Sequence, residues 1–319
     1  MFSFINWLKA IATILITNSH YADIWPVSAM AAGGHLGNCL FFLVSGFCMC
    51  HIKESFPKWY AKRILRIYPA LWLAIAINLV LGFFSIGSFT GFLHCFFYPT
   101  WYHFITSIML LYLLFFPVRT LQKKYAVSSI WVILITLLLF TLVYLFRFDS
   151  SYYHLDAVEE NWVRFQFWIS MMAGAHLRES YARISSKISV AEWILLPVLT
   201  VVYFAAKIAV SRYPILWDVQ FLSPLTLLLL VIYLSLIFIK LEKQGRFASE
   251  NRLNPLIRFL SSITLEIYLV QNVIIDKLSF LPFPVNFLVV TALILTVAWA
   301  VHWVAVRLQK ALLSCLKLN

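Results

Sequence analysis

The stretch VSSIWVILITLLLFTLVYLF, residues 127–146, decides the fold class of this chain. It contains no charged side chain, and it lies between the basic pair Lys123 and Lys124 and the single Arg147. A helix of about 20 predominantly apolar residues is long enough to cross the hydrocarbon core of a bilayer. We therefore interpret this stretch as a membrane-spanning helix.

The composition of the whole chain extends this interpretation. Of its 319 residues, 62% are hydrophobic and 12% are charged, whereas about 25% of residues are charged in soluble domains. Ten spanning helices would use about 200 residues and leave about 119 for loops and ends. Because this remainder has no room for a second, soluble domain, we predict a single transmembrane domain over residues 1–319.

Further apolar runs predict an all-α polytopic transmembrane bundle of about ten helices. The predicted helices cover residues 4–22, 35–52, 67–84, 101–118, 127–146, 161–177, 190–210, 219–239, 259–277 and 285–307. No internal repeat of 20–50 residues and no low-complexity tract is visible in the sequence.

Charged residues are distributed unevenly over the loops between these segments. The chain has 25 Lys+Arg and 13 Asp+Glu, which gives a formal net charge of +12. In a soluble protein this excess would suggest nucleic-acid binding, but in a membrane protein it marks the cytoplasmic loops. The basic residues gather in alternate loops and include Lys58, Arg63, Arg119, Arg183, Lys243 and Arg258. This pattern predicts that both termini are cytoplasmic and that no nucleic acid is bound.

The five cysteines lie mostly in or beside apolar runs and show no paired C-x-x-C spacing. They are Cys39, Cys48, Cys50, Cys95 and Cys315. The odd number and the spacing argue against a disulfide framework and against a metal site. Since the N-terminus has no short apolar core ending in a small-residue cleavage site, we expect a retained first helix.

The first predicted helix carries two ionisable residues, Lys9 and His20, in the stretch WLKAIATILITNSHY. Eleven positions separate them, which corresponds to about 16 Å along a helix and about 1100° of rotation, so both lie on one face. Ionisable side chains inside a bilayer are costly and are candidates for function. A lone histidine near a helix end is more often a satisfied interfacial residue, but a lysine on the same face weakens that interpretation.

Two motifs follow in and after the second predicted helix. In FFLVSGFCMC, Ser45 and Gly46 favour close helix packing over a nucleophilic serine, because no G-x-S-x-G elbow surrounds the serine. Farther on, Arg63 and Arg66 are three positions apart on one helical face. Two guanidinium groups at this spacing can bind phosphates, and anchoring at the cytoplasmic interface is an equally good interpretation.

Further polar residues lie within later apolar segments. Glu266 is predicted at a depth similar to that of Lys9, so the two charges can neutralise one another across the bundle interior. Gln271 lies about 8 Å further along the same helix, with Tyr268 between them. Arg164, at the start of the sixth predicted helix, is another charge that needs a partner.

Five elements of the sequence occur in an order that is known from one family. Lys9 and His20 stand at the spacing of an [R/K]-x10-H feature, FFLVSGF matches F-F-x-x-S-G-F, and RILRIYP at 63–69 matches R-x-x-R followed by I-Y-P. WYHFITSIMLLYLLFFP and SSITLEIYLVQ match two further segments. Over nearly its whole length, the chain resembles the acyltransferase-3 family of bacterial integral membrane acyltransferases.

The resemblance implies a ten-helix core in the bacterial inner membrane that takes an acyl group, usually acetyl, from cytoplasmic acyl-CoA. It implies an acceptor hydroxyl on a surface glycan, such as an O-antigen, or on its lipid-linked precursor. By the same resemblance, His20 corresponds to the essential histidine and Lys9 to its basic partner. Arg63 and Arg66 correspond to arginines associated with the acyl donor. Direct attack on the thioester and an acyl-enzyme on His20 or a serine are both compatible with this chemistry.

Three positions depart from the family pattern. Lys9 occupies a slot where arginine is commoner, so it supplies a point charge instead of a planar fork. Gln271 stands where a histidine is often found, so a second titrating imidazole is absent at that position. Cys39 stands where many members have an aspartate.

Two other classes of protein remain open. A proton- or ion-coupled transporter or flippase would use Lys9, His20 and Glu266 in an ion pathway, although the sequence shows no inverted repeat. A membrane scaffold would leave the spacing of these residues without a function. Several aromatic residues predicted at the outer face fit sugar stacking or, preferably, an interfacial belt. They include Trp25, Trp101, Tyr102, Tyr152, Tyr153 and Trp162.

Overall fold

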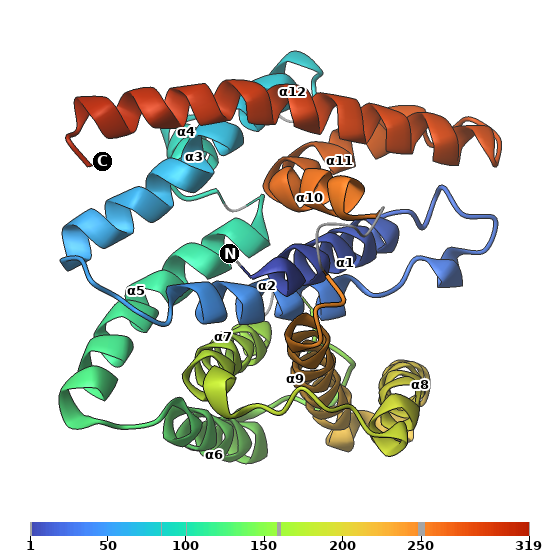
Figure 1. Ribbon diagram of the computed structural model, residues 1–319. Coiled ribbons are helices and arrows are strands. Elements are labelled where there is room, and N and C mark those ends of the chain that lie inside the picture. The colour runs from blue at the N-terminus through green and yellow to red at the C-terminus, as the bar shows by residue number, and fades with distance from the viewer. Residues whose placement is uncertain (1, 84, 100, 158–160, 248–252, 319) are drawn as a thin grey trace. The chain divides into compact units, whose positions relative to one another are not determined.

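The computed structural model describes residues 2–83, 85–99, 101–157, 161–247 and 253–318, and within these ranges it contains helices and no strand (Figure 1). The α-helices are α1 (Ser3–Ser19), α2 (Gly34–Met49), α3 (Phe56–Val80), α4 (Phe89–Phe96), α5 (His103–Tyr125), α6 (Ser129–Arg147), α7 (Trp162–Ser180), α8 (Val190–Arg212), α9 (Leu222–Lys243), α10 (Asn254–Ser262), α11 (Thr264–Leu278) and α12 (Val285–Cys315). Short 3-10 helices are η1 (Ser28–Met30), η2 (Tyr181–Arg183) and η3 (Pro214–Val219). The predicted all-α class is confirmed.

Each of the ten predicted segments contains a helix, but the helices depart from the prediction in several places. α3 begins at Phe56, well before the predicted start, because Pro57 fits the first turn of a helix and the basic residues after it continue the helix. α4 is an additional short helix. The ninth segment is broken into α10 and α11, which meet at an angle of 71°. By length and composition, seven helices of the described chain can cross a membrane, or eight if α10 and α11 form one broken span.

Polar side chains define where several of these helices begin. At the start of α8, Ser189 Oγ accepts a hydrogen bond from the Glu192 backbone N–H at 3.2 Å, and Glu192 Oε2 accepts one from the Ser189 backbone N–H at 2.8 Å. At the start of α4, Ser88 Oγ accepts a hydrogen bond from the Gly91 backbone N–H at 3.0 Å. Each bond satisfies a backbone group that a helix start leaves without an intrahelical partner.

Contacts along the chain define two compact units, each made of three segments. Unit 1 comprises Met1–Lys9, Asn38–His51 and Pro117–Pro255, and unit 2 comprises Ala10–Gly37, Ile52–Phe116 and Leu256–Asn319. In unit 1, α7 packs against α6 and α9, and α8 packs against α9. The single transmembrane domain stays a prediction.

Within unit 1, α2 and α7 approach each other so closely that two positions require glycine. A Cβ atom at Gly46 would lie 1.7 Å from the carbonyl oxygen of Met171, and one at Gly174 would lie 1.9 Å from that of Leu43. Small residues allow such an approach of two helix backbones in a membrane. The close packing predicted for Ser45 and Gly46 is therefore present.

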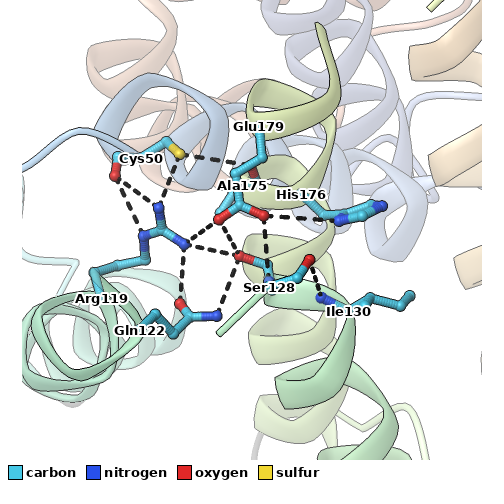
Figure 2. A network of polar contacts seen from close by, with 9 residues as sticks. Cys50, Arg119, Gln122, Ser128, Ile130, Ala175, His176 and Glu179 are labelled. Carbon is cyan, nitrogen blue, oxygen red and sulfur yellow. Dashed lines mark hydrogen bonds and ion pairs between the residues drawn. The ribbon is translucent and has the colours of Figure 1, made fainter. Parts of the chain in front are cut away.

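A polar network centred on Arg119 connects α5, α6 and α7 with Cys50, the residue that follows α2 (Figure 2). The Arg119 guanidinium donates to the Cys50 carbonyl oxygen at 3.1 and 3.2 Å, to Gln122 Oε1 at 2.9 Å, to Ser129 Oγ at 2.8 Å and to Glu179 Oε1 at 2.6 Å. Burial raises the pKa of Glu179, but the contact with His176 Nδ1 at 3.8 Å and hydrogen bonds from Arg119 and Ser129 outweigh burial and lower this pKa to about 2. Glu179 is therefore a stable anion that holds α5, α6 and α7 together next to the end of α2.

In unit 2, the long helix α12 packs along both α3 and α11, and α11 also packs against α3 (Figure 1). The buried residues of α12 recur every three or four positions, at Asn286, Val290, Ile294, Ala298, Val301 and Ala305. This spacing forms one stripe along the helix, as expected for a helix that packs on one side only. Most of the predicted site residues lie in this unit.

Candidate active site

His20 lies directly after the last residue of α1, and its side chain is exposed. The neighbouring Asn18 organises the loop that follows. Its Nδ2 donates hydrogen bonds to the carbonyl oxygens of Met30 at 2.8 Å and Ala32 at 3.0 Å, and its Oδ1 accepts one from Trp25 Nε1 at 2.9 Å. These bonds fold residues 20–32 back onto the end of α1, so His20 belongs to a defined loop.

The same loop is fixed to the first turns of α12. The Tyr21 hydroxyl and Thr291 Oγ1 form a hydrogen bond of 2.9 Å. Asn286 Nδ2 donates to the carbonyl oxygen of Ile24 at 3.1 Å, and the rings of Tyr21 and Phe287 meet edge to face at 5.9 Å between centroids. The residue next to His20 is thus held by α12, which places the histidine on unit 2.

Lys9 lies on α1, and its side chain is half-buried. α1 ends at Ser19, so His20 lies one residue beyond it, in unit 2, whereas Lys9 belongs to unit 1. The separation of about 16 Å between the two residues, expected from the rise of an α-helix, therefore stays a prediction.

Arg63 and Arg66 lie on the second and third turns of α3, with Arg63 half-buried and Arg66 exposed. The Arg63 guanidinium lies over the Trp59 ring, 4.9 Å from its centroid. The neighbouring Lys62 forms an ion pair with Glu54 at 2.6 Å, and this hydrogen bond lowers the pKa of the Glu54 carboxyl. The acidic residue near the arginine pair, Glu54, is therefore neutralised by Lys62.

Glu266 is buried in the first turn of α11, directly after the break between α10 and α11. Its Oε1 lies 2.9 Å from Nδ1 of His302, on α12. His302 was not predicted as a site residue, although an ionisable side chain within a long apolar segment is a signal of function. The expected neutralisation of Glu266 by Lys9 joins residues of different units and stays a prediction.

A second polar group surrounds the middle of α11. Asn78 Nδ2, on α3, donates to the Tyr102 hydroxyl at 2.6 Å, and this hydroxyl donates to the carbonyl oxygen of Leu269 at 3.0 Å. Tyr102 is only 6% exposed, so its assignment to an outer aromatic belt is wrong. Its ring packs beside that of Tyr268, with 6.0 Å between the ring centroids.

Gln271 follows on the same helix and is fully buried, with 0% of its surface exposed. Neither Oε1 nor Nε2 of its side chain has a hydrogen-bond partner among the described residues. A buried polar atom without a partner is uncommon and costs about 1–3 kcal/mol. Gln271 thus provides a buried donor and a buried acceptor that no described residue of the protein uses.

The two remaining predicted site residues belong to unit 1. Ser45 is half-buried on α2, next to the glycine that packs against α7. Arg164, in the first turn of α7, donates a hydrogen bond to Asn161 Oδ1. Arg164 therefore has the partner that its position in an apolar segment required.

Fold and site together define a multi-pass membrane protein that carries ionisable and polar side chains within its apolar helices. The sequence model of one family, described as Acyltransferase domain and known as the acyltransferase-3 family, matches residues 2–303. The chain belongs to this family, and it is a membrane acyltransferase. No match was found among curated proteins or among solved structures.

Proposed function

We propose that this protein transfers an acetyl group from cytoplasmic acetyl-CoA to a hydroxyl of a surface glycan, or of its lipid-linked precursor, in the bacterial inner membrane. The observation that carries the proposal is the membership in the acyltransferase family together with the spacing of Lys9 and His20 in the sequence. The pantetheine arm of CoA is long and thin, comparable to the separation of about 16 Å between these residues.

The donor end of this reaction is assigned to α3. Acetyl-CoA is highly anionic and does not enter lipid, so its phosphates stay at a basic face of the membrane protein. Arg63 and Arg66 are suited to this role because guanidinium groups bind phosphate oxygens through two parallel hydrogen bonds. The pantetheine arm then extends along the bundle and brings the thioester to the level of His20.

The acceptor end is assigned to the loop that carries His20. In its neutral form the imidazole accepts the proton of the acceptor hydroxyl while the hydroxyl oxygen attacks the thioester carbonyl carbon. The carbon–sulfur bond then breaks, and the proton passes from the imidazolium to the departing CoA thiolate. An acyl-enzyme on His20 or a serine is the other route, and kinetics that distinguish a ternary complex from ping-pong behaviour separate the two.

Donor binding can be measured as thermal stabilisation of the detergent-solubilised protein by acetyl-CoA. A ligand at 100 times its Kd stabilises the folded state by about 2.7 kcal/mol. We expect R63Q/R66Q to lose this stabilisation, because the phosphates lose their charged partners. The matched control R183Q removes one exposed arginine of unit 1 and should retain the stabilisation. Wild-type protein that shows no stabilisation at saturating donor would contradict the proposal.

A proton-coupled transporter is the second candidate, and the pair of Glu266 and His302 beside a broken span favours it. A transporter requires no acyl donor. Stabilisation by acetyl-CoA that R63Q/R66Q abolishes would therefore favour the acyltransferase over the transporter.

A further inference from the structure

We propose that Gln271 is a catalytic residue whose side-chain amide donates a hydrogen bond to the oxygen of the reacting acyl carbonyl. This inference rests on the proposed acyl transfer and assigns a new role within the same site. Transfer from a thioester to a hydroxyl passes through a tetrahedral intermediate in which the former carbonyl oxygen is negatively charged. Side-chain amides are among the groups that stabilise such an oxyanion in enzymes.

The first argument is the unused amide itself. Gln271 is completely buried, and its Nε2 donates no hydrogen bond to any described residue. Asn78, 2% exposed, also carries a buried Oδ1 that has no hydrogen-bond partner in the described part of the chain. Buried polar atoms in folded proteins are nearly always hydrogen-bonded, so such atoms require an explanation. A substrate group that arrives during the reaction is the explanation that fits an enzyme.

The second argument is that Gln271 is held in place by its surroundings. The carbonyl oxygen of Leu269, two positions earlier on α11, accepts a hydrogen bond from Tyr102, which in turn accepts one from Asn78. These bonds join α11 to α3 and to the residue before α5. A donor stabilises a transition state effectively only when it is positioned beforehand, because it then needs no reorganisation during the reaction.

The third argument is the level of Gln271 along the helices of unit 2. The hydrogen bond between Glu266 and His302 places these two residues at one level of α11 and α12. The 279–284 loop joins α11 to α12. Thr291 lies eleven positions closer to this loop than His302 does, which corresponds to about 16 Å along α12. Gln271 lies five positions, about 7.5 Å, from Glu266 in the same direction.

Thr291 bonds to Tyr21, the neighbour of His20. Gln271 therefore lies about 9 Å, measured along the helix axes, from the level of Thr291, to which the loop that carries His20 is bonded. In the proposed complex, the thioester carbonyl lies between these two levels, with its carbon toward the base and its oxygen toward the amide.

The proposed step conserves atoms and charge. The acceptor oxygen forms a bond to the carbonyl carbon and gives its proton to His20, while the carbonyl π electrons move onto the oxygen that faces Gln271. When the intermediate collapses, the carbonyl re-forms, the carbon–sulfur bond breaks and the CoA thiolate takes the proton from His20. The products are the acyl ester and CoA, and Gln271 donates the same hydrogen bond throughout.

The test compares variants of the full-length protein in detergent, with acetyl-CoA as donor. Q271M keeps the length of the side chain and removes both polar atoms, and Q271A removes the whole amide. We expect kcat to fall about 10²–10³-fold in each, while stabilisation by acetyl-CoA and the donor KM change less than about twofold. Q271H retains an N–H donor and should recover much of kcat.

The melting temperature provides a readout that separates catalysis from structure. Since the amide has no partner in the described chain, Q271M should keep or raise the melting temperature. The matched control is Q122M in unit 1, whose amide accepts a bond from Arg119. It should lower the melting temperature and leave kcat within about twofold.

Three results would overturn the assignment of Gln271. They are a kcat of Q271M or Q271A within about fivefold of the wild type, a loss that appears entirely in a KM, and failure of both variants to fold. None of these results bears on the proposed function, because the wild type would still bind the donor and transfer the acyl group. Conversely, if the wild-type protein neither binds acetyl-CoA nor transfers its acetyl group, both the proposed function and the role of Gln271 are wrong.

Discussion

At the scale of single residues, the central observation is how His20 is held. Its place eleven positions after Lys9 can be seen in the sequence itself. Its surroundings are not readable, because the bond between Tyr21 and Thr291 joins residues 270 positions apart. The same holds for Tyr102, whose partner Leu269 is 167 positions away. Pattern and spacing thus predict the candidate base, whereas tertiary structure identifies the groups that position it.

Replacement of the proposed base should abolish catalysis without unfolding the protein. We expect H20Q to lower kcat about 10²–10⁴-fold, the usual contribution of a general base. Because His20 is exposed, its melting temperature should stay close to that of the wild type. Because the surrounding protein desolvates the imidazole and lowers the pKa of His20, kcat/KM of the wild type should fall only at a pH below the range of an ordinary imidazole, where His20 becomes protonated and cannot accept a proton. Transfer rates under saturating donor measure both effects.

A matched control for this variant is H94Q, which changes another exposed histidine of unit 2, on α4. It should leave both the rate and the pH profile unchanged. An H20Q protein that transfers acetyl at the wild-type rate would exclude His20 as the base.

At the scale of helices, the apolar runs predicted which segments are helical. They did not predict where a helix is interrupted. The run at 285–307 became α12, which ends only at Cys315, and the run at 259–277 is divided by a 71° bend. Hydropathy does not reveal this bend, because both sides of it are rich in apolar residues. The bend matters for the site, since it places Glu266 in the first turn of α11 beside His302.

The contact between α2 and α7 gives a stability prediction at this scale. We expect G46A to lower the melting temperature strongly, because its Cβ would lie 1.7 Å from a backbone oxygen of α7 that has little freedom to move. Overpacking of this kind typically costs about 1–3 kcal/mol, and a backbone contact lies at the upper end. The control G87A adds a Cβ that meets no atom within 4 Å and should be neutral. Equal melting temperatures for the two variants would disprove the close contact.

At the scale of the whole molecule, composition and charge predicted the class of protein. A charged content of 12% indicated a membrane protein, and seven or eight candidate spans among the described residues agree with it. The match to the acyltransferase family over residues 2–303 then identified the type of reaction. Sequence alone could not predict the two polar groups inside unit 2, because each is assembled from helices far apart in the chain.

The central claim is that this protein acetylates a surface glycan and that His20 is required. Its most direct test is the content of acetyl esters in the surface glycans of the host, measured by mass spectrometry in three strains. These strains carry the wild-type gene, no gene, or the H20Q variant at equal protein level. We expect acetyl esters in the first strain and their loss in the other two. The same acetyl-ester content in all three strains would contradict it.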